Sequence, residues 1–366
     1  MALSRKIIFT VTNDLTYDQR MQKICRSLSN AGYEIELVGR ERSFSLLLSN
    51  ESFKQTRLKC IFNKGKLFYL EYNLRLLFYL LFQKADALCA IDLDTIAPVY
   101  LAGKVKSAKL IYDAHEYFTE VPEVIRRPSV KRIWEWVERT FVPRFDLAYT
   151  VSPALAELFS GKHNKQFHVI RNIPLLVQSS IVNRQSSMVI LYQGALNEGR
   201  GLEHLIGAMK DIDAKLLLAG EGDLSNELRS LTKKLNLESK VKFLGFIKPA
   251  QLKELTSKAT IGINLLENKG LSYYYSLSNK FFDYIHAGVP QVCIAFPEYK
   301  KINDEYEIAL LMETCSIAEI RNAIERLLSD DDLYKRLQKK CEVCSLDLNW
   351  QNEEKKLVAL YDELLR

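Results

Sequence analysis

Residues 188–206 read "MVILYQGALNEGRGLEHLI", a short apolar strand that passes through a glycine-rich turn into a helix predicted over 201–210. The strand is apolar along its whole length, as is typical of strands buried on both faces of a parallel sheet. A strand followed by such a helix is the repeating unit of α/β proteins. The stretch therefore predicts a parallel sheet that is covered by helices.

The same alternation continues towards the C-terminus. Strands are expected at "AKLLLAG", "VKFLGF", "TIGINLL" and "QVCIAF", and they are separated by predicted helices. These helices lie over 224–235, from Pro249, over 278–288 and over 316–345, and "WQNEEKKLVALYDELL" closes the chain as a last helix. The pattern indicates a doubly wound sheet in the second half.

The first half shows an alternation of its own. "KIIFTVTN", "YEIELVGR", "DALCAI", "AKLIYDAH", "DLAYTVS" and "FHVIRN" are expected strands, whereas "IPLLVQSSIVNRQSS" (173–187) has neither a helical nor a strand period. We therefore expect an α/β protein of two doubly wound, Rossmann-like domains that face each other across a cleft. The expected parts are an N-terminal domain over 1–175, a C-terminal domain over 186–345, and a helix over 346–366 that packs back on the N-terminal domain.

The composition is that of a globular protein, with 48% hydrophobic and 26% charged residues. No run of about eighteen apolar residues occurs, and "MALSRKIIFT" enters a strand directly, so we expect neither a membrane span nor a signal peptide. Scattered cysteines favour a reducing cytoplasm. Residues 1–175 hold 26 basic against 18 acidic residues, and residues 176–366 hold 25 against 27. This asymmetry indicates either an anionic partner of the first half or a solvated surface.

Glycines follow two strands of the second half, at the edge where doubly wound sheets bind ligands. Gly199 and Gly201 flank Arg200 at the start of a helix, which suits phosphate oxygens; the alternative is a turn with a solvated arginine. Gly220 and Gly222 follow the next strand, but the third glycine of the dinucleotide fingerprint is missing. A nicotinamide enzyme is therefore disfavoured.

The stretch "SLSNKFFDYIHAGVP" (276–290) predicts a short helix that begins at the N-cap Ser278 and ends at Gly288. Lys280 and Asp283 lie in its first turns. The apolar face of so short a helix does not explain why it carries a cation and a carboxylate there. A diphosphate could be held by Lys280 together with the amides of the 279–281 turn, and a ribose could donate its hydroxyls to Asp283. The helix is therefore expected to bind a nucleotide.

In the first half, His115 directly follows a strand and stands between Asp113 and Glu116. Such a cluster at a strand end is either part of a site or a set of capping residues in a turn. No Ser–His–Asp or Cys–His arrangement stands out, and the five histidines make a metal hydrolase improbable. We expect neither a metal ion nor a cofactor.

Other polar residues of the first half have structural alternatives. Asp92 and Asp94 in "IDLDT" resemble a metal-binding pair, but Asp94 or Thr95 is expected to cap the following helix instead. Asp18 and Arg20 lie near the end of the first strand. They either face an acceptor or belong to a solvated helix face.

Taken in order along the chain, these motifs resemble a known family. "QGALNEGRGLEHLI", "LLLAGEGDLSNELRSL", "VKFLGFIKPAQLKELTSKATIGINLL" and "NKFFDYIHAGVPQV" closely resemble the donor domain of the family 4 retaining glycosyltransferases, which have the GT-B fold. "DAHEYFTEVPEV" and "YTVSPALAELF" resemble the acceptor domain of that family. The resemblance extends over nearly the whole chain and implies transfer of a sugar from a nucleotide sugar, which is a substrate and not a cofactor.

The resemblance also implies roles for single residues. The family's diphosphate-binding basic residue falls on Arg200, and the ribose-binding acid of its paired-glutamate motif falls on Asp283. The histidine near the donor sugar corresponds to His115. The implied catalytic residues are His115, Arg200 and Lys280, and the implied donor-binding residues are Gly199, Gly201, Gly220, Gly222, Ile247 at the base, Ser278, Asn279 and Asp283.

The sequence departs from the family pattern at three places. Ala195 stands where many relatives have an arginine, and Tyr275 stands where the first glutamate of the pair helps to hold the donor sugar. The usual glycine-rich loop after the first strand is replaced by "TNDLTYDQR". Asn279 and Lys280 are expected to take over part of the lost contacts. Two rival hypotheses are a sugar-nucleotide epimerase of the same fold and a non-catalytic subunit that binds sugar nucleotides.

The expected partners are a nucleotide sugar and a glycan or lipid-linked acceptor, with no nucleic acid. The protein is expected in the cytoplasm, peripherally at the inner face of the membrane. Arg132, Trp136 and Arg139 share one face of the helix predicted in "RRPSVKRIWEWVERTFVPRF" (126–145), which suits an anionic membrane surface. A second candidate is "KLFYLEYNLRLLFYLLFQK" (66–84), whose apolar content fits a buried helix equally well.

Overall fold

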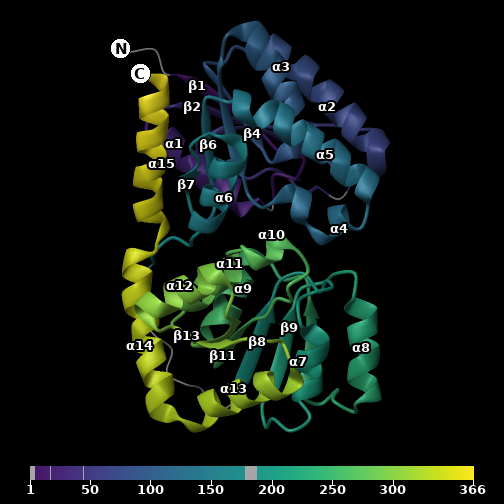
Figure 1. Ribbon diagram of the computed structural model, residues 1–366, viewed down its shortest axis with the longest axis vertical. Coiled ribbons are helices and arrows are strands. Elements are labelled where there is room, and N and C mark those ends of the chain that lie inside the picture. Colours follow the sequence, from purple (N-terminus) through teal and green to yellow (C-terminus); the bar gives the residue numbers. More distant parts are fainter. Residues whose placement is uncertain (1–4, 17, 44, 178–187) are drawn as a thin grey trace. The chain divides into compact units, whose positions relative to one another are not determined.

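The computed structural model describes residues 5–16, 18–43, 45–177 and 188–366. The chain forms two compact units (Figure 1). Unit 1 comprises Met1–Asn172 together with Glu353–Arg366, and unit 2 comprises Ile173–Asn352. Each unit has its own parallel sheet, which confirms the α/β fold with two doubly wound sheets. No helix among the described residues is long and apolar enough to cross a membrane.

Unit 1 is built on a seven-stranded sheet in the order β3-β2-β1-β4-β5-β6-β7, and every pair of neighbours is parallel. Its strands are β1 (Lys6–Thr10), β2 (Glu34–Arg40), β3 (Lys54–Leu58), β4 (Ala87–Ile91), β5 (Lys109–Ala114), β6 (Leu147–Thr150) and β7 (His168–Val169). The sequence pattern did not predict β3, because this edge strand, "KQTRL", carries almost no apolar residues. Its place is set by pairing with β2.

The helices of unit 1 lie on the two faces of this sheet (Figure 1). One face is covered by α2 (Gly65–Phe82), α3 (Ile96–Lys106) and α5 (Pro128–Phe141), which pack side by side. The other face carries α1 (Gln19–Asn30), α6 (Pro153–His163) and the unit 1 part of α15 (Trp350–Leu365). The short helix α4 (Pro122–Ile125) precedes α5. Right-handed crossovers from parallel strand to parallel strand produce this division.

Helix α15 is fixed to unit 1 by aromatic and polar contacts. Tyr361 is fully buried, stacks on Phe9 of β1 and lies 3.1 Å, oxygen to oxygen, from the hydroxyl of Tyr149 in β6. The hydroxyl of Tyr33 donates to Asp362 at 2.6 Å. The last residues of the chain therefore complete the core of the unit in which the chain begins.

Unit 2 contains a six-stranded parallel sheet in the order β10-β9-β8-β11-β12-β13. The strands are β8 (Val189–Gln193), β9 (Lys215–Ala219), β10 (Val241–Gly245), β11 (Ile261–Asn264), β12 (Gln291–Ile294) and β13 (Ala309–Met312). The helices are α7 (Leu202–Ala208), α8 (Ser225–Lys234), α9 (Pro249–Ser257), α10 (Leu271–Tyr274), α11 (Asn279–His286), α12 (Pro297–Tyr306), α13 (Ile317–Ser329) and α14 (Asp331–Asp347). The order reverses at β8 and β11, so a ligand site is expected at the carboxyl ends of these strands.

Candidate functional site

The glycines of unit 2 bring two loops together at the carboxyl ends of β8 and β9. Gly220 has φ +150°, and a Cβ on it would lie 1.9 Å from the carbonyl oxygen of Gly194. A Cβ on Gly222 would lie 2.2 Å from Oδ1 of Asn197. The amide of Leu196 also donates to the carbonyl of Glu221. The two glycines are thus explained by close packing of the loops, which brings backbone into the region where an anion is expected.

The loop after β8 leads into α7 through two further glycines. Gly199 and Gly201 both have positive φ, +77° and +63°, a conformation that favours glycine, and Gly201 is the N-cap of α7. Gly199 lies against the ring of Tyr273, since a Cβ there would be 3.0 Å from the ring edge. This conformation fixes the direction in which Arg200 leaves the loop.

Lys280 in the first turn of α11 has a buried side chain, with 7% of its surface exposed. Its Nζ lies 3.8 Å from the ring centre of Tyr192 and has no hydrogen-bond partner among the described residues. Burial, together with the positive charge of Arg200, lowers the pKa of Lys280 well below its usual range. An aromatic face attracts the charge but accepts no ordinary hydrogen bond, so the N–H groups of Lys280 suit an anionic ligand.

Arg200 repeats this arrangement. Its guanidinium lies 4.8 Å from the ring centre of Tyr273, and its buried Nε has no hydrogen-bond partner among the described residues. The charge of Arg200 acts on both Lys280 and Tyr192, whose pKa burial raises to about 12. Two cations held over aromatic rings therefore lie in one region. The sequence patterns did not identify Tyr192 and Tyr273 as their supports.

Asp283 lies one turn beyond Lys280 on α11, so the two side chains share a face of the helix. Its carboxylate accepts a hydrogen bond from Nε2 of Gln193 at 2.8 Å. Oε1 of the buried Gln193 accepts in turn from the hydroxyl of Thr256 at 2.7 Å. Gln193 therefore orients Asp283, a role whose only sequence signal is an amide at the end of an apolar strand.

The start of α11 differs in one detail from the expectation. Ser278 occupies the N-cap position, but its hydroxyl donates to Oδ1 of Asn264 at 2.9 Å and does not cap the helix. Asn279 follows as the first, exposed residue of α11. Gly288, with φ +64°, follows the C-cap as predicted. Ile247 comes after β10 and packs, half-buried, beside the apolar cluster around Tyr284.

In unit 1, His115 is held between two carboxylates at the carboxyl ends of β4 and β5. Its Nε2 lies 3.2 Å from Oδ2 of Asp113 and its Nδ1 lies 3.7 Å from Oδ2 of Asp92. The amide of His115 donates to Oδ1 of Asp92 at 2.8 Å. Burial alone would lower the pKa of His115, but the charges of Asp113 and Asp92 raise it to about 9. The imidazole is therefore a cation at neutral pH.

Arg20 was expected to face either an acceptor or solvent, and the structure contradicts this expectation. It is buried and bonds both carboxylate oxygens of Asp113, at 2.9 and 3.3 Å, and the carbonyl of Ile170 at 3.0 Å. Burial opposes ionisation of Asp113, but the charges of Arg20 and His115 still lower its pKa. Asp18, by contrast, caps α1 by accepting from the amide of Met21. Arg20 thus holds Asp113, which holds His115.

Thr95 occupies the N-cap position of α3, as predicted, but capping through the side chain of Asp94 or Thr95 is wrong. Neither makes such a bond; the Thr95 hydroxyl donates to the carbonyls of Thr10 and Ile91, and Asp94 accepts from Thr12. Asp92 has φ +54°, a strained value for a residue other than glycine. Burial raises the pKa of Asp92 above its usual range, against the opposing charge of His115. Strain and a shifted carboxyl pKa together mark Asp92 as part of the cluster.

Comparisons with known proteins agree with this arrangement. Residues 178–342 match the model of the family described as glycosyl transferases group 1, and this range contains the cations, the glycines and Asp283. An uncharacterized glycosyltransferase of Methanocaldococcus jannaschii is 38% identical over 86 residues. That match spans 22% of this chain and 22% of the length of the relative.

Solved structures are similar over nearly the whole chain. Sucrose-phosphate synthase from Thermosynechococcus elongatus has a TM-score of 0.84 at 17% identity, over 98% of this chain and 99% of that chain. HepE of Anabaena, in complex with UDP and glucose, has a TM-score of 0.79 at 16% identity over the same shares. WaaG, a glycosyltransferase involved in lipopolysaccharide biosynthesis, has a TM-score of 0.70 at 13% identity, over 96% and 98%. These likenesses show that the fold is GT-B.

Proposed function

We propose that this protein, whose residues 178–342 form a group 1 glycosyl transferase domain on a GT-B fold, transfers a sugar from a nucleoside-diphosphate sugar to an acceptor hydroxyl. The observation that carries the proposal is the buried Lys280, which has no hydrogen-bond partner among the described residues and lies near Arg200. Structural residues rarely leave a buried ammonium in this state, because it costs stability. A diphosphate would satisfy both cations.

In this proposal the diphosphate is bound by Arg200 and Lys280, and the ribose hydroxyls donate to Asp283, which Gln193 orients. The backbone at Gly220 and Gly222 lies beside the diphosphate. UDP is the first nucleotide to test, because the Anabaena structures of this fold contain UDP and UDP-glucose. Ser278, Asn279 and Ile247 remain donor contacts by resemblance.

The proposed reaction breaks the bond between the anomeric carbon and the phosphate oxygen and forms a bond to the acceptor oxygen on the same face. Negative charge grows on the leaving diphosphate, where Arg200 and Lys280 stabilise it. The acceptor proton passes to an oxygen of the leaving phosphate. A protonated His115 is a hydrogen-bond donor and no base, so its proposed role is to hold a hydroxyl of the donor sugar. The retention of configuration comes from the family resemblance.

The acceptor is proposed to be a hydroxyl of a glycan or of a lipid-linked sugar, as in polysaccharide biosynthesis. A second candidate, a subunit that binds sugar nucleotides without turnover, is supported by Tyr275. This residue replaces the carboxylate that holds the donor sugar in the family, and its ring packs on Tyr274 at 5.1 Å between centres. Turnover of a panel of nucleotide sugars separates the two: release of nucleoside diphosphate supports the enzyme, and binding alone supports the subunit.

The proposal is tested at the cation pair. Arg200→Ala should weaken UDP binding, measured by calorimetry, and should lower turnover by about a hundred- to a thousandfold, because its contact strengthens as the leaving group departs. Asp283→Ala should weaken binding with less effect on saturated turnover. Arg321→Ala is the matched control, because Arg321 pairs with Asp211 on the surface of the same unit. UDP binding by a folded Arg200→Ala protein at wild-type affinity would remove the basis of the proposal.

A further inference from the structure

The two helical faces of unit 1 have different outer surfaces. Within the described residues, α1, α6 and the unit 1 part of α15 expose no large hydrophobic side chain. On the other face, α2 exposes a row that is between 48% and 83% accessible to solvent and consists of Leu67, Leu70, Leu74, Phe78 and Phe82. Their spacing places them on one side of the helix. The contrast within one unit shows that this apolar surface is specific to one face.

The neighbouring segments extend the apolar surface. Helix α3, which packs beside α2, exposes Leu101 and Val105, and α5 exposes Ile133 and Trp136. The amides of Ile61 and Phe62, both exposed, donate to Glu71 and so hold these two residues on α2. An exposed apolar surface of this extent is uncommon on a monomer and marks a place of interaction. We call the exposed apolar residues of 61–82 the α2 face.

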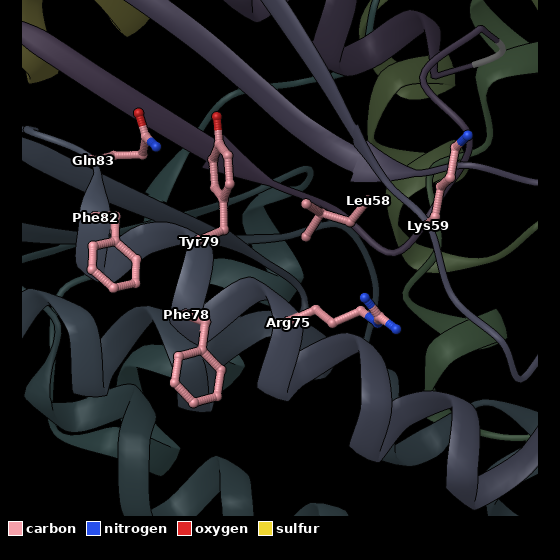
Figure 2. A pocket seen from close by; sticks show the side chains of 7 residues that line it. All are labelled: Leu58, Lys59, Arg75, Phe78, Tyr79, Phe82 and Gln83. Carbon is pink, nitrogen blue, oxygen red and sulfur yellow. The ribbon is translucent and has the colours of Figure 1, made fainter.

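A hollow of about 450 Å³ lies at the edge of the α2 face, between the end of β3 and the second half of α2. Figure 2 shows Phe78 and Phe82 one turn apart along α2, with Tyr79 between them. Lys59 and Arg75 line the same hollow. It therefore combines an apolar wall with two basic side chains, which pair with Glu41 at 3.6 Å and with Glu71 at 2.8 Å respectively.

The positive charge around the α2 face indicates which kind of partner can bind there. Residues 59–84 contain five basic residues and one acidic residue. The acidic residue, Glu71, is already bonded to Arg75 and to the amides of residues 61 and 62. Two copies of the chain would bring two cationic rims together, which opposes self-association. An anionic lipid surface offers both an apolar layer and negative charge.

We propose that the α2 face binds the surface of an anionic phospholipid bilayer. The leucines and phenylalanines of α2 enter the boundary of the acyl chains, and the lysines that flank them contact the phosphate groups. The hollow receives one acyl chain along Phe78 and Phe82. This assignment does not depend on the proposed transfer reaction, because none of these residues belongs to the donor site or to the His115 cluster.

The assignment revises the surface expected from the sequence. The residues singled out in α5, Arg132, Trp136 and Arg139, are all exposed, as expected. The segment 66–84 was equally compatible with a buried helix, and the structure buries only Phe68, Tyr72, Leu76 and Leu80 on its inner side. Helix α2 therefore contributes more exposed apolar surface than α5. We place the centre of the contact on α2 and its edge on α5.

The test is sedimentation of the full-length protein with vesicles of phosphatidylglycerol and phosphatidylcholine, or of phosphatidylcholine alone, at low and high salt. Wild-type protein should bind the anionic vesicles at low salt. Leu70→Ser with Leu74→Ser should lower the partition coefficient by about tenfold or more, because two apolar side chains no longer enter the lipid. Val343→Ser with Leu346→Ser on α14 is the control, since these side chains are 47% and 61% exposed, against 59% and 48% for Leu70 and Leu74.

The charge contribution is tested separately. Lys64→Glu with Lys66→Glu should also lower binding by about tenfold or more, whereas Lys355→Glu with Lys356→Glu on α15 should leave it close to wild type. Circular dichroism checks that each variant is folded. The proposal is overturned if the wild type does not bind anionic vesicles at low salt. It is also overturned if the α2 double variant binds them as well as the α14 control variant does. A lipid-free dimer that Leu70→Ser with Leu74→Ser abolishes also overturns it, in favour of a second copy.

Discussion

Replacing Lys280 by Met should change stability and ligand binding in opposite directions. Methionine keeps the length and the apolar stem of the side chain but removes an ammonium that has no hydrogen-bond partner among the described residues. Leaving such a group buried costs more than about 1–3 kcal/mol. The cation–π contact with the ring of Tyr192 at 3.8 Å offsets up to about 2 kcal/mol of this desolvation cost. Lys280→Met should therefore stabilise unit 2 by about 1–2 kcal/mol, or raise Tm by roughly 2–8 °C.

The stability gain should depend on pH. Because the pKa of Lys280 is lower in the folded protein than in the unfolded chain, the unfolded chain holds the extra proton between these two pKa values. The free energy of unfolding of the wild type should therefore rise with pH through this window. The advantage of Lys280→Met should be largest below the lowered pKa and should vanish above the usual pKa of lysine.

The same substitution should weaken UDP binding by roughly 3 kcal/mol, or about a hundredfold, because a charged contact to the diphosphate is lost. A diphosphate beside Nζ favours the ammonium form, so binding to the wild type should take up a proton, and affinity should fall as pH rises above the lowered pKa.

Thermal unfolding from pH 6 to 10 measures the stability effect, and calorimetry in two buffers of different ionisation heat measures the proton uptake. The control variant is Lys258→Met, at the exposed C-cap of α9. A less stable Lys280→Met protein, or one that binds UDP like the wild type, would refute the reasoning.

Three further substitutions test the remaining parts of the two units. His115→Ala should reduce transfer by about a hundredfold or more while UDP binding stays near wild type, as steady-state kinetics and calorimetry will show; equal loss of both would place His115 outside the reaction centre. Arg20→Gln removes the guanidinium that pairs with the buried carboxylate of Asp113 and leaves only His115 beside it. It should destabilise unit 1 by about 3–5 kcal/mol in urea unfolding, and a cost below about 1 kcal/mol would contradict the buried pair. Gly220→Ala should destabilise unit 2 and weaken UDP binding because its Cβ meets the carbonyl of Gly194, whereas Gly161→Ala in α6, with no atom within 4 Å, should be neutral or stabilising by up to about 1 kcal/mol.

The alternation of strands and helices could be predicted because it depends on local periodicity. The strands from "KIIFTVTN" to "QVCIAF" and the last helix were found in this way, since buried parallel strands and amphipathic helices leave clear patterns. The edge strand β3 was missed because only its pairing with β2 makes it a strand, and β13, an edge strand of the unit 2 sheet, was missed as well. The domain limits at 175, 186 and 345 stay predictions, as do the roles of the donor-binding residues.

Side-chain partners could be predicted less well because they join distant parts of the chain. Arg20 and Asp113 are 93 positions apart, and nothing near Arg20 in the sequence distinguishes it from a solvated helix residue. Gln193 and Asp283 are 90 positions apart. Asp92 was interpreted through its local neighbours as part of a helix start, whereas its carboxylate receives the amide of His115. Local patterns predict elements, and the packing of those elements decides which polar groups meet.

The burial of Tyr361 between β1 and β6 has a consequence for synthesis of the chain. Unit 1 contains both Met1–Asn172 and Glu353–Arg366, and the second of these segments is translated only after all of unit 2, Ile173–Asn352. Domains of a nascent chain generally fold in order from the N-terminus. Here the second unit can reach its native state on the ribosome while the first still exposes the site that Tyr361 fills. Residues 353–366 must therefore leave the ribosome before unit 1, most of which is made first, can finish folding.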